Sequence, residues 1–232
     1  MRVEIYADVV CPWCYIGEKR FEKALERFDG EVDVVYRPFQ LDPGAPEEAT
    51  PLRDYLDRRF GAGAGRVTDH AGEAAAGEGI AIDWDSAQSV NTFQAHRLLR
   101  LALLEYGPYA QRDLMERLFA AHFSQGGNVG DRDELLELAV AAGMDGDRVR
   151  AYLASDEGAE ALREELERAR RIGIGSVPTF VIEGKYAVQG GQPPETFLQV
   201  LEDVRAKIGA SGEPDSSQES GTAPGNPDAR HG

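Results

Sequence analysis

A pair of cysteines three positions apart most constrains what this chain can fold into. Cys11 and Cys14 are the only cysteines in 232 residues, and they lie between an apolar, strand-like run at 3–10 and a helix-like run at 15–28. This order places Cys11 at the N-terminus of a helix, where unpaired N–H groups and the helix dipole favour a thiolate. The second thiol is near enough to close a disulfide. The sequence therefore predicts a redox-active dithiol.

Two other interpretations of the cysteines are weaker. A structural zinc site needs four ligands, with a second Cys or His pair at matching spacing. The histidines are scattered instead, at His70, His96, His122 and His231. Isolated cysteines are often inert buried residues, but a strand, a CxxC motif and a helix in succession indicate redox chemistry more strongly than CxxC alone. We therefore expect no metal site.

Composition excludes several classes of function. The hydrophobic fraction of 42% suffices for a core, and a net charge of −16 disfavours nucleic acid, whose binding relies on basic patches. No apolar run reaches 18 residues, so we expect no membrane span. The first residues already resemble a strand, with no signal-peptide layout before them. We therefore expect a cytoplasmic protein, in which a CxxC is catalytic or redox-responsive rather than a structural disulfide.

The order of elements predicts an α/β fold. A strand at 3–10, a helix at 15–28 and a strand at 31–41 form a β–α–β unit with parallel strands. Residues 43–174 then show helical patterns without strands. Helix-like runs in this segment are 52–60, 65–78, 91–106, 110–123, 131–142, 149–154 and 159–171. A hairpin at 179–188 and a helix from Pro193 close the ordered part.

This order predicts three parts of the chain. Residues 1–42 and 175–208 form one α/β domain, and residues 43–174 form an inserted, all-helical domain. Residues 209–232 are rich in Gly, Ser, Pro and acidic residues with almost nothing apolar, so we expect a disordered acidic tail.

Three features resemble a known family: Cys11-Pro12-Trp13-Cys14, Gly175-Ser176-Val177-Pro178-Thr179-Phe180, and the order of elements. Together they resemble the DsbA-like branch of the thioredoxin fold, βαβ…ββα with a large helical insertion. Within that branch, Cys14-Tyr15-Ile16-Gly17 and Asn91-Thr92 ahead of Ala95-His96-Arg97 are similar to the FrnE-type cytosolic group of dithiol oxidoreductases. Related 2-hydroxychromene-2-carboxylate isomerases and kappa-class glutathione transferases carry serine at the position of Cys11.

The resemblance implies the second half of the site. The Val177–Pro178 bond is expected to be cis and to lie against the CxxC motif, leaving the Val177 backbone free to pair with an extended substrate. Ser176 is expected to contact substrate beside it. The residue pattern alone leaves open a trans proline at the start of a strand.

Exchange chemistry assigns a role to each residue of the motif. Cys11 is the exposed nucleophile, and Cys14, one helical turn inside, resolves the mixed disulfide. Pro12 and Trp13 tune the dithiol, since proline supplies no N–H and tryptophan supplies an apolar surface. Asp8 raises a thiol pKa if it is buried nearby, or else is a capping or exposed carboxylate.

Two further residues are candidates through the resemblance. His96 is either a substrate-side or glutathione-side residue or a packed histidine of a helix. Asn91 is either a ligand or a helix cap.

The sequence thus predicts a thiol–disulfide oxidoreductase that acts on protein or small-molecule disulfides. Disulfide isomerase activity is one form that this exchange can take. Its cofactor is its own redox-active disulfide, with glutathione as a candidate co-substrate, and it is a monomer or homodimer. One alternative is a glutathione-dependent isomerase or transferase for an aromatic or polyketide-type molecule. Another is a non-enzymatic, redox-responsive binding protein.

Overall fold

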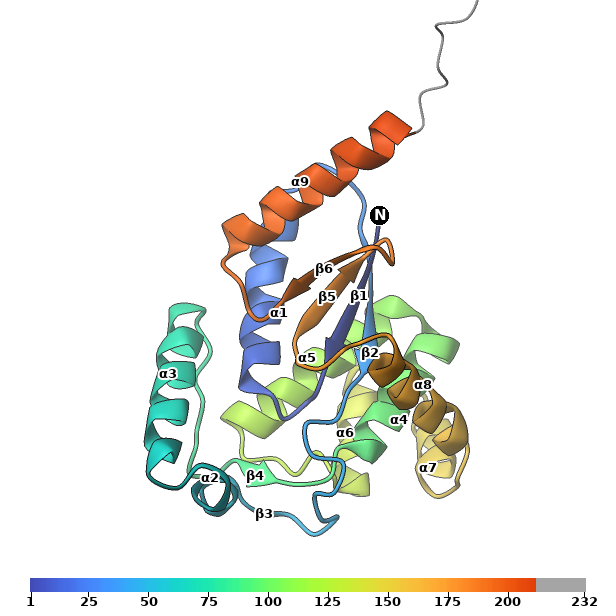
Figure 1. Cartoon of the computed structure of the whole chain (residues 1–232). Helices are drawn as coiled ribbons and strands as arrows, with labels where there is room; N and C mark the ends of the chain where they lie inside the picture. The colour runs from blue at the N-terminus through green and yellow to red at the C-terminus, as the bar shows by residue number, and fades with distance from the viewer. Residues whose placement is uncertain (212–232) are drawn as a thin grey trace, which may run out of the picture.

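A four-stranded mixed sheet forms the centre of the molecule in a computed structural model that describes residues 1–211. The strands are β1 (Arg2–Ala7), β2 (Asp33–Pro38), β5 (Thr179–Ile182) and β6 (Tyr186–Gln189). Their order in the sheet is β2-β1-β5-β6 (Figure 1). β1 is parallel to β2 and antiparallel to β5, which is antiparallel to β6. The first strand therefore lies beside a strand from the far end of the chain.

Alternating side chains give the sheet two buried faces. On one face, α1 (Pro12–Leu25) and α9 (Pro194–Ser211) pack over the strands. There the Phe180 ring centroid lies 5.1 Å from that of Phe21 and 4.5 Å from that of Phe197. On the other face Tyr6 packs with residues at the end of α8 (Ala159–Arg171). The sheet is thus covered by helices from both ends of the chain.

The segment between β2 and β5 is mainly helical. Its other helices are α2 (Leu52–Phe60), α3 (Ala64–Gly77), α4 (Phe93–Leu101), α5 (Pro108–Ser124), α6 (Arg132–Ala141) and α7 (Gly146–Leu153). A 3₁₀ turn at Gly61–Gly63 joins α2 to α3, and a π-helical turn at Ala102–Tyr106 continues α4. In Figure 1, α2 and α3 form an arm beside α1, apart from the other inserted helices.

The predicted βαβ…ββα order is confirmed, with corrections to the boundaries. The first helix begins at Pro12 rather than at residue 15, because proline is well suited to the first helical position. β1 ends at Ala7 rather than residue 10, and β2 is shorter than the predicted 31–41.

The prediction that no strand occurs within 43–174 is wrong. A short antiparallel ladder joins β3 (Thr50–Pro51) to β4 (Gln88–Ser89). Strands of two residues are too short to show an alternating pattern, so the sequence offers no signal for them.

α9 continues to Ser211, past Gly209, where the tail was expected to begin; the rest of that segment lies outside the described residues.

The division into domains stays a prediction. Among residues 1–211, no helix combines the length and apolarity needed to cross a membrane.

Buried polar contacts join α1, β2 and α5. The Gln111 side chain accepts a hydrogen bond from the Tyr36 N–H at 2.9 Å and donates one to the Tyr36 carbonyl at 3.1 Å. It thereby pairs backbone groups at the edge of the sheet, where β2 has no further strand. The Tyr36 hydroxyl donates to Glu18 of α1. Burial raises the pKa of Glu18 to about 8.

Replacing Glu18 by glutamine should flatten the pH dependence of stability. An unfolded glutamate loses its proton near pH 4.3, whereas folded Glu18 keeps its proton up to about pH 8. The wild type should therefore lose stability as pH rises between these values, by roughly 1.4 kcal/mol per pH unit relative to Glu18→Gln. Urea unfolding between pH 6.5 and 8 measures this difference.

That pH range also avoids the buried His122, whose pKa burial lowers to about 4 and which should destabilise the fold only as pH falls below 6.5. Glu167→Gln, at an exposed position of α8, is the matched control and should follow the wild type. Parallel pH profiles for Glu18→Gln and wild type would contradict a protonated Glu18.

Candidate active site

The N-terminus of α1 holds the two thiols. Cys11 is the N-cap of the helix, as predicted, and Pro12 occupies the first helical position. The Cys11 N–H donates to the Asp8 carbonyl at 3.0 Å, and the Cys11 carbonyl accepts from the Cys14 N–H at 3.0 Å. These bonds hold the turn that joins the end of β1 to the helix. Both thiols are free, with no disulfide between them.

Cys14 lies one turn inside the helix and is only 2% exposed. Burial raises the pKa of the Cys14 thiol well above its ordinary value, and a hydrogen bond with Cys11 acts in the same direction. The negative charge of Asp8 also raises it. The inner sulfur therefore favours the neutral thiol over the thiolate.

The loop before β5 supplies the opposite wall. The Val177–Pro178 peptide bond is cis, as the resemblance predicted. The Val177 carbonyl oxygen lies 3.9 Å from the Cys11 sulfur. The loop is held by the Gly190 N–H, which donates to the Pro178 carbonyl at 2.8 Å, and by the Thr179 hydroxyl, which donates to the Ser176 carbonyl at 2.7 Å.

Two glycines allow this loop to approach α1. A Cβ atom on Gly17 would lie 3.0 Å from Pro178 Cγ and 3.2 Å from Gly191 Cα. A Cβ atom on Gly191 would meet the Trp13 carbonyl oxygen at 3.2 Å. Contacts this short mean that a side chain at either position would push its neighbour away. Gly17 and Gly191 therefore set the distance between the helix and the Pro178 loop.

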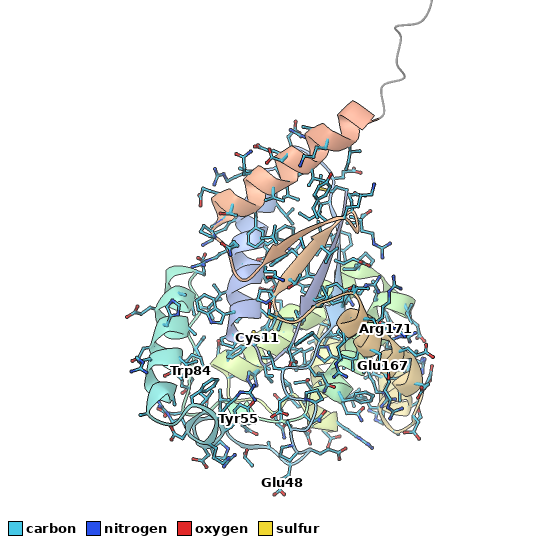
Figure 2. All side chains as sticks on the ribbon, in the orientation of Figure 1. Cys11, Glu48, Tyr55, Trp84, Glu167 and Arg171 are labelled. Carbon is cyan, nitrogen blue, oxygen red and sulfur yellow. The ribbon has the colours of Figure 1, made fainter. Side chains whose placement is uncertain are left out.

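A cavity of about 300 Å³ lies over the Cys11 sulfur. Cys11 is only 4% exposed, so the expectation of an openly exposed nucleophile is wrong. The Val177 carbonyl lies 3.9 Å from its sulfur, and α2, in the inserted segment, forms part of the cavity wall, with Tyr55 among its lining residues. In Figure 2, Tyr55 and Trp84 lie below Cys11, and all three residues line the cavity.

Asp8 and His96 form a buried pair behind the thiols. Asp8 is fully buried and His96 is 2% exposed, with His96 Nε2 3.1 Å from Asp8 Oδ1. The Leu41 N–H donates to the second Asp8 oxygen at 2.8 Å. Of the two interpretations of Asp8, burial beside a thiol is the observed one. His96 is packed under Asp8 and does not line the cavity, so the structure places it away from the substrate side.

Asn91 and Ser176 also lie off the cavity. The Asn91 amide donates to the Ala45 carbonyl at 2.9 Å and its oxygen accepts from the Phe93 N–H at 2.9 Å, so it tethers the loop after β2 to the start of α4. Ser176 is exposed, and its carbonyl accepts a hydrogen bond from the Thr179 hydroxyl. By contrast, Cys11, Pro12, Trp13 and Val177 all line the cavity.

Two histidines without a sequence signal lie near the site. The His70 ring of α3 packs on Trp13, with centroids 5.0 Å apart. His122 is fully buried, neither ring nitrogen has a hydrogen-bond partner, and burial lowers its pKa to about 4. Only the tertiary packing of α3 and α5 brings these residues close, so spacing along the chain could not reveal them. Within the described part of the chain, no three His, Cys, Asp or Glu residues gather to hold a metal ion.

Comparisons with known proteins agree with this geometry. A family model of the DSBA-like thioredoxin domain matches residues 2–202. The chain is similar to the crystal structure of a probable DsbA oxidoreductase from Streptomyces coelicolor, with 36% identity, a TM-score of 0.83, and coverage of 97% of this chain and 100% of that chain.

Two more distant structures share the fold. The cytosolic disulfide reductase DsbM from Pseudomonas aeruginosa has 21% identity and a TM-score of 0.61, with 90% of this chain and 100% of that chain covered. A 2-hydroxychromene-2-carboxylate isomerase has 16% identity and a TM-score of 0.63, with 91% and 97% covered. The predicted fold class and the resemblance to the DsbA-like branch are confirmed. The finer similarity to the FrnE-type group stays a prediction.

The two thiols should differ sharply in reactivity toward a small alkylating reagent. In the reduced native protein, iodoacetamide should modify Cys11 through the cavity and leave Cys14 unmodified, because Cys14 is buried and its raised pKa disfavours the thiolate. Intact-mass and peptide mass spectrometry measure the order of modification. In denaturant both cysteines should react alike, which is the control. Faster modification of Cys14 than of Cys11 in the native protein would refute this geometry.

Proposed function

Because the chain belongs to the family of DSBA-like thioredoxin domains, we propose that it is a thiol–disulfide oxidoreductase working through Cys11 and Cys14. The observation that carries the proposal is the position of the Cys11 sulfur. It faces a cavity, lies 3.9 Å from the Val177 carbonyl, and has the second thiol of the motif directly behind it. This is an arrangement for making and breaking a disulfide.

The reaction follows from the different environments of the two sulfurs. The Cys11 thiolate, at the positive end of α1, attacks a substrate disulfide and forms a mixed disulfide, while the other half of the substrate leaves as a thiolate. Cys14 then loses its proton and attacks the Cys11 sulfur. The products are the Cys11–Cys14 disulfide and the second substrate thiolate, so two electrons pass from protein to substrate. The reverse sequence oxidises a substrate dithiol.

The remaining residues of the site act through contact and position. Val177 presents backbone beside the outer sulfur, and Pro178 forms the wall that α1 packs against. Trp13 gives an apolar surface next to Cys11 and is itself packed by His70. We further propose that the protein acts in the cytoplasm on protein or small-molecule disulfides, with its own disulfide as the only redox group. The similarity to a protein named as a cytosolic disulfide reductase supports this location.

Substitution of each cysteine should separate the two roles. Cys11→Ser should reduce insulin-disulfide reduction, with dithiothreitol as the final reductant, to the uncatalysed rate, because no nucleophile faces the cavity. Cys14→Ser should also lose turnover but accumulate a mixed disulfide at Cys11, detectable by intact mass as an adduct that a reductant removes. Refolding of a scrambled protein, run with the same variants, measures isomerase activity.

The double variant Cys11→Ser/Cys14→Ser is the matched control and should form no adduct. Full activity in Cys11→Ser would end the proposal. A small-molecule isomerase that uses Cys11 only as a contact would retain its activity in Cys14→Ser, so that variant also distinguishes the two enzyme classes.

A further inference from the structure

The cavity over Cys11 is lined mainly by apolar side chains. The chain has two tryptophans, Trp13 and Trp84, and both line this cavity together with Tyr55. Other apolar side chains complete the walls: Val10, Leu52, Leu56, Val90 and Val177. Such a surface, with few polar groups, is typical of a small-molecule pocket.

Three of the exposed apolar residues line the cavity. Leu41, Phe60 and Val67 are 42%, 45% and 39% exposed, and all three line the cavity. We call these three residues the cavity mouth. They come from three separate segments of the chain, so their proximity is a product of the fold. A contiguous exposed apolar patch marks a binding surface, whereas scattered apolar residues do not.

Charges in the lining oppose a highly polar ligand. Among the described lining residues, Arg59 is the only cation. Asp8 is already bonded to His96 and to the Leu41 N–H, and Asp42 accepts from the Gly44 N–H. The uncharged polar residues of the lining are Tyr55, Gln88, Ser89 and Thr92. Glutathione carries two carboxylates and an ammonium group, and a lining with one cation pairs only one of the two carboxylates.

The size of the cavity gives the same conclusion. A volume of about 300 Å³ is at the lower limit for ligand pockets and suits one compact ring system. Cys11 and Val177 form part of the cavity wall. When the aromatic ring of a small thiol fills the cavity, the thiol group attached to that ring therefore lies beside the Cys11 sulfur. We propose that the cavity binds the aromatic body of a small thiol, and that compact aromatic thiols exchange with the dithiol in preference to glutathione and peptide thiols. This inference rests on the proposed function.

The exchange balances without another reactant. The thiolate of the aromatic thiol attacks the Cys11 sulfur of the oxidised protein, the Cys11–Cys14 bond breaks, and Cys14 leaves and takes up a proton. A second aromatic thiolate attacks the ligand sulfur of the mixed disulfide and releases the Cys11 thiolate, which takes up the second proton. Two thiols thus become one aromatic disulfide, and the protein gains two electrons and two protons.

Reduction of the oxidised full-length protein by a series of thiols tests the inference. The series is benzyl mercaptan, 2-mercaptoethanol, glutathione and a cysteine-containing tetrapeptide, each in excess, with acid quenching and intact mass as the readout. Each rate is divided by the rate of the same thiol with 5,5′-dithiobis(2-nitrobenzoate), which removes differences in intrinsic nucleophilicity. Benzyl mercaptan should then exceed the other three by about tenfold or more.

Variants at the cavity mouth assign the preference to the cavity. Phe60→Ala and Val67→Ala should each lower the ratio of the benzyl mercaptan rate to the 2-mercaptoethanol rate several-fold. Both positions are partly exposed, so the core stays intact. Tyr109→Ala, at a residue 87% exposed and outside the cavity, is the matched control and should leave both rates unchanged.

A non-reactive probe separates binding from chemistry. Benzyl methyl sulfide cannot exchange, yet it should change tryptophan fluorescence saturably, because both tryptophans line the cavity, and Phe60→Ala should weaken its binding. Equal normalised rates for all thiols, or a preference for the tetrapeptide, would overturn the inference while leaving the oxidoreductase intact. Failure of every thiol to reduce the protein would overturn the proposed function itself, and saturable binding of the sulfide would still locate the aromatic site.

Discussion

The antiparallel pairing of β1 with β5 is the constraint on which the site depends. Its register sets Tyr6 opposite Thr179 and Ile5 opposite Phe180, which brings the loop before β5 to the turn after β1. A shift of one residue would turn Phe180 away from Phe21 and toward the opposite face, so core packing enforces the register. The 3.9 Å separation between Cys11 and the Val177 carbonyl is therefore a consequence of sheet pairing and not of local sequence.

The polar groups beneath the site show how the fold keeps the two sulfurs different. Cys14, Asp8 and His96 are all nearly inaccessible, and Asp8 is held by His96 and by a backbone N–H. A buried carboxylate raises the cost of a second negative charge nearby, which favours a neutral Cys14. The Cys11 sulfur instead lies at the N-terminus of α1 and faces the cavity. One sulfur is thus arranged to react first and the other to follow.

Much of the sheet and the dithiol could be predicted from the sequence, because their signals are local. Each signal lies within a few residues of the sequence. The signals are the apolar runs of the strands, Pro12 in the first helical turn, and Val177-Pro178 before a strand. The arm formed by α2 and α3 gave no such signal for its position, since its helices bury few side chains. Three features of the site depend on contacts between segments far apart in the chain. They are the burial of Cys11, the Asp8–His96 pair and the packing of His70 on Trp13. Periodicity and motif spacing carry no information on such contacts.

The placement of β5 between β1 and β6 has a consequence for synthesis of the protein. Residues 11 and 14 are synthesised more than 160 residues before β5, the strand that pairs with β1. Until then the nascent chain carries both thiols without the Val177–Pro178 loop that faces Cys11. The wall beside the Cys11 sulfur therefore forms only once β5 has been synthesised, and a chain that ends before β5 carries the motif without the Val177 carbonyl that lies 3.9 Å from that sulfur.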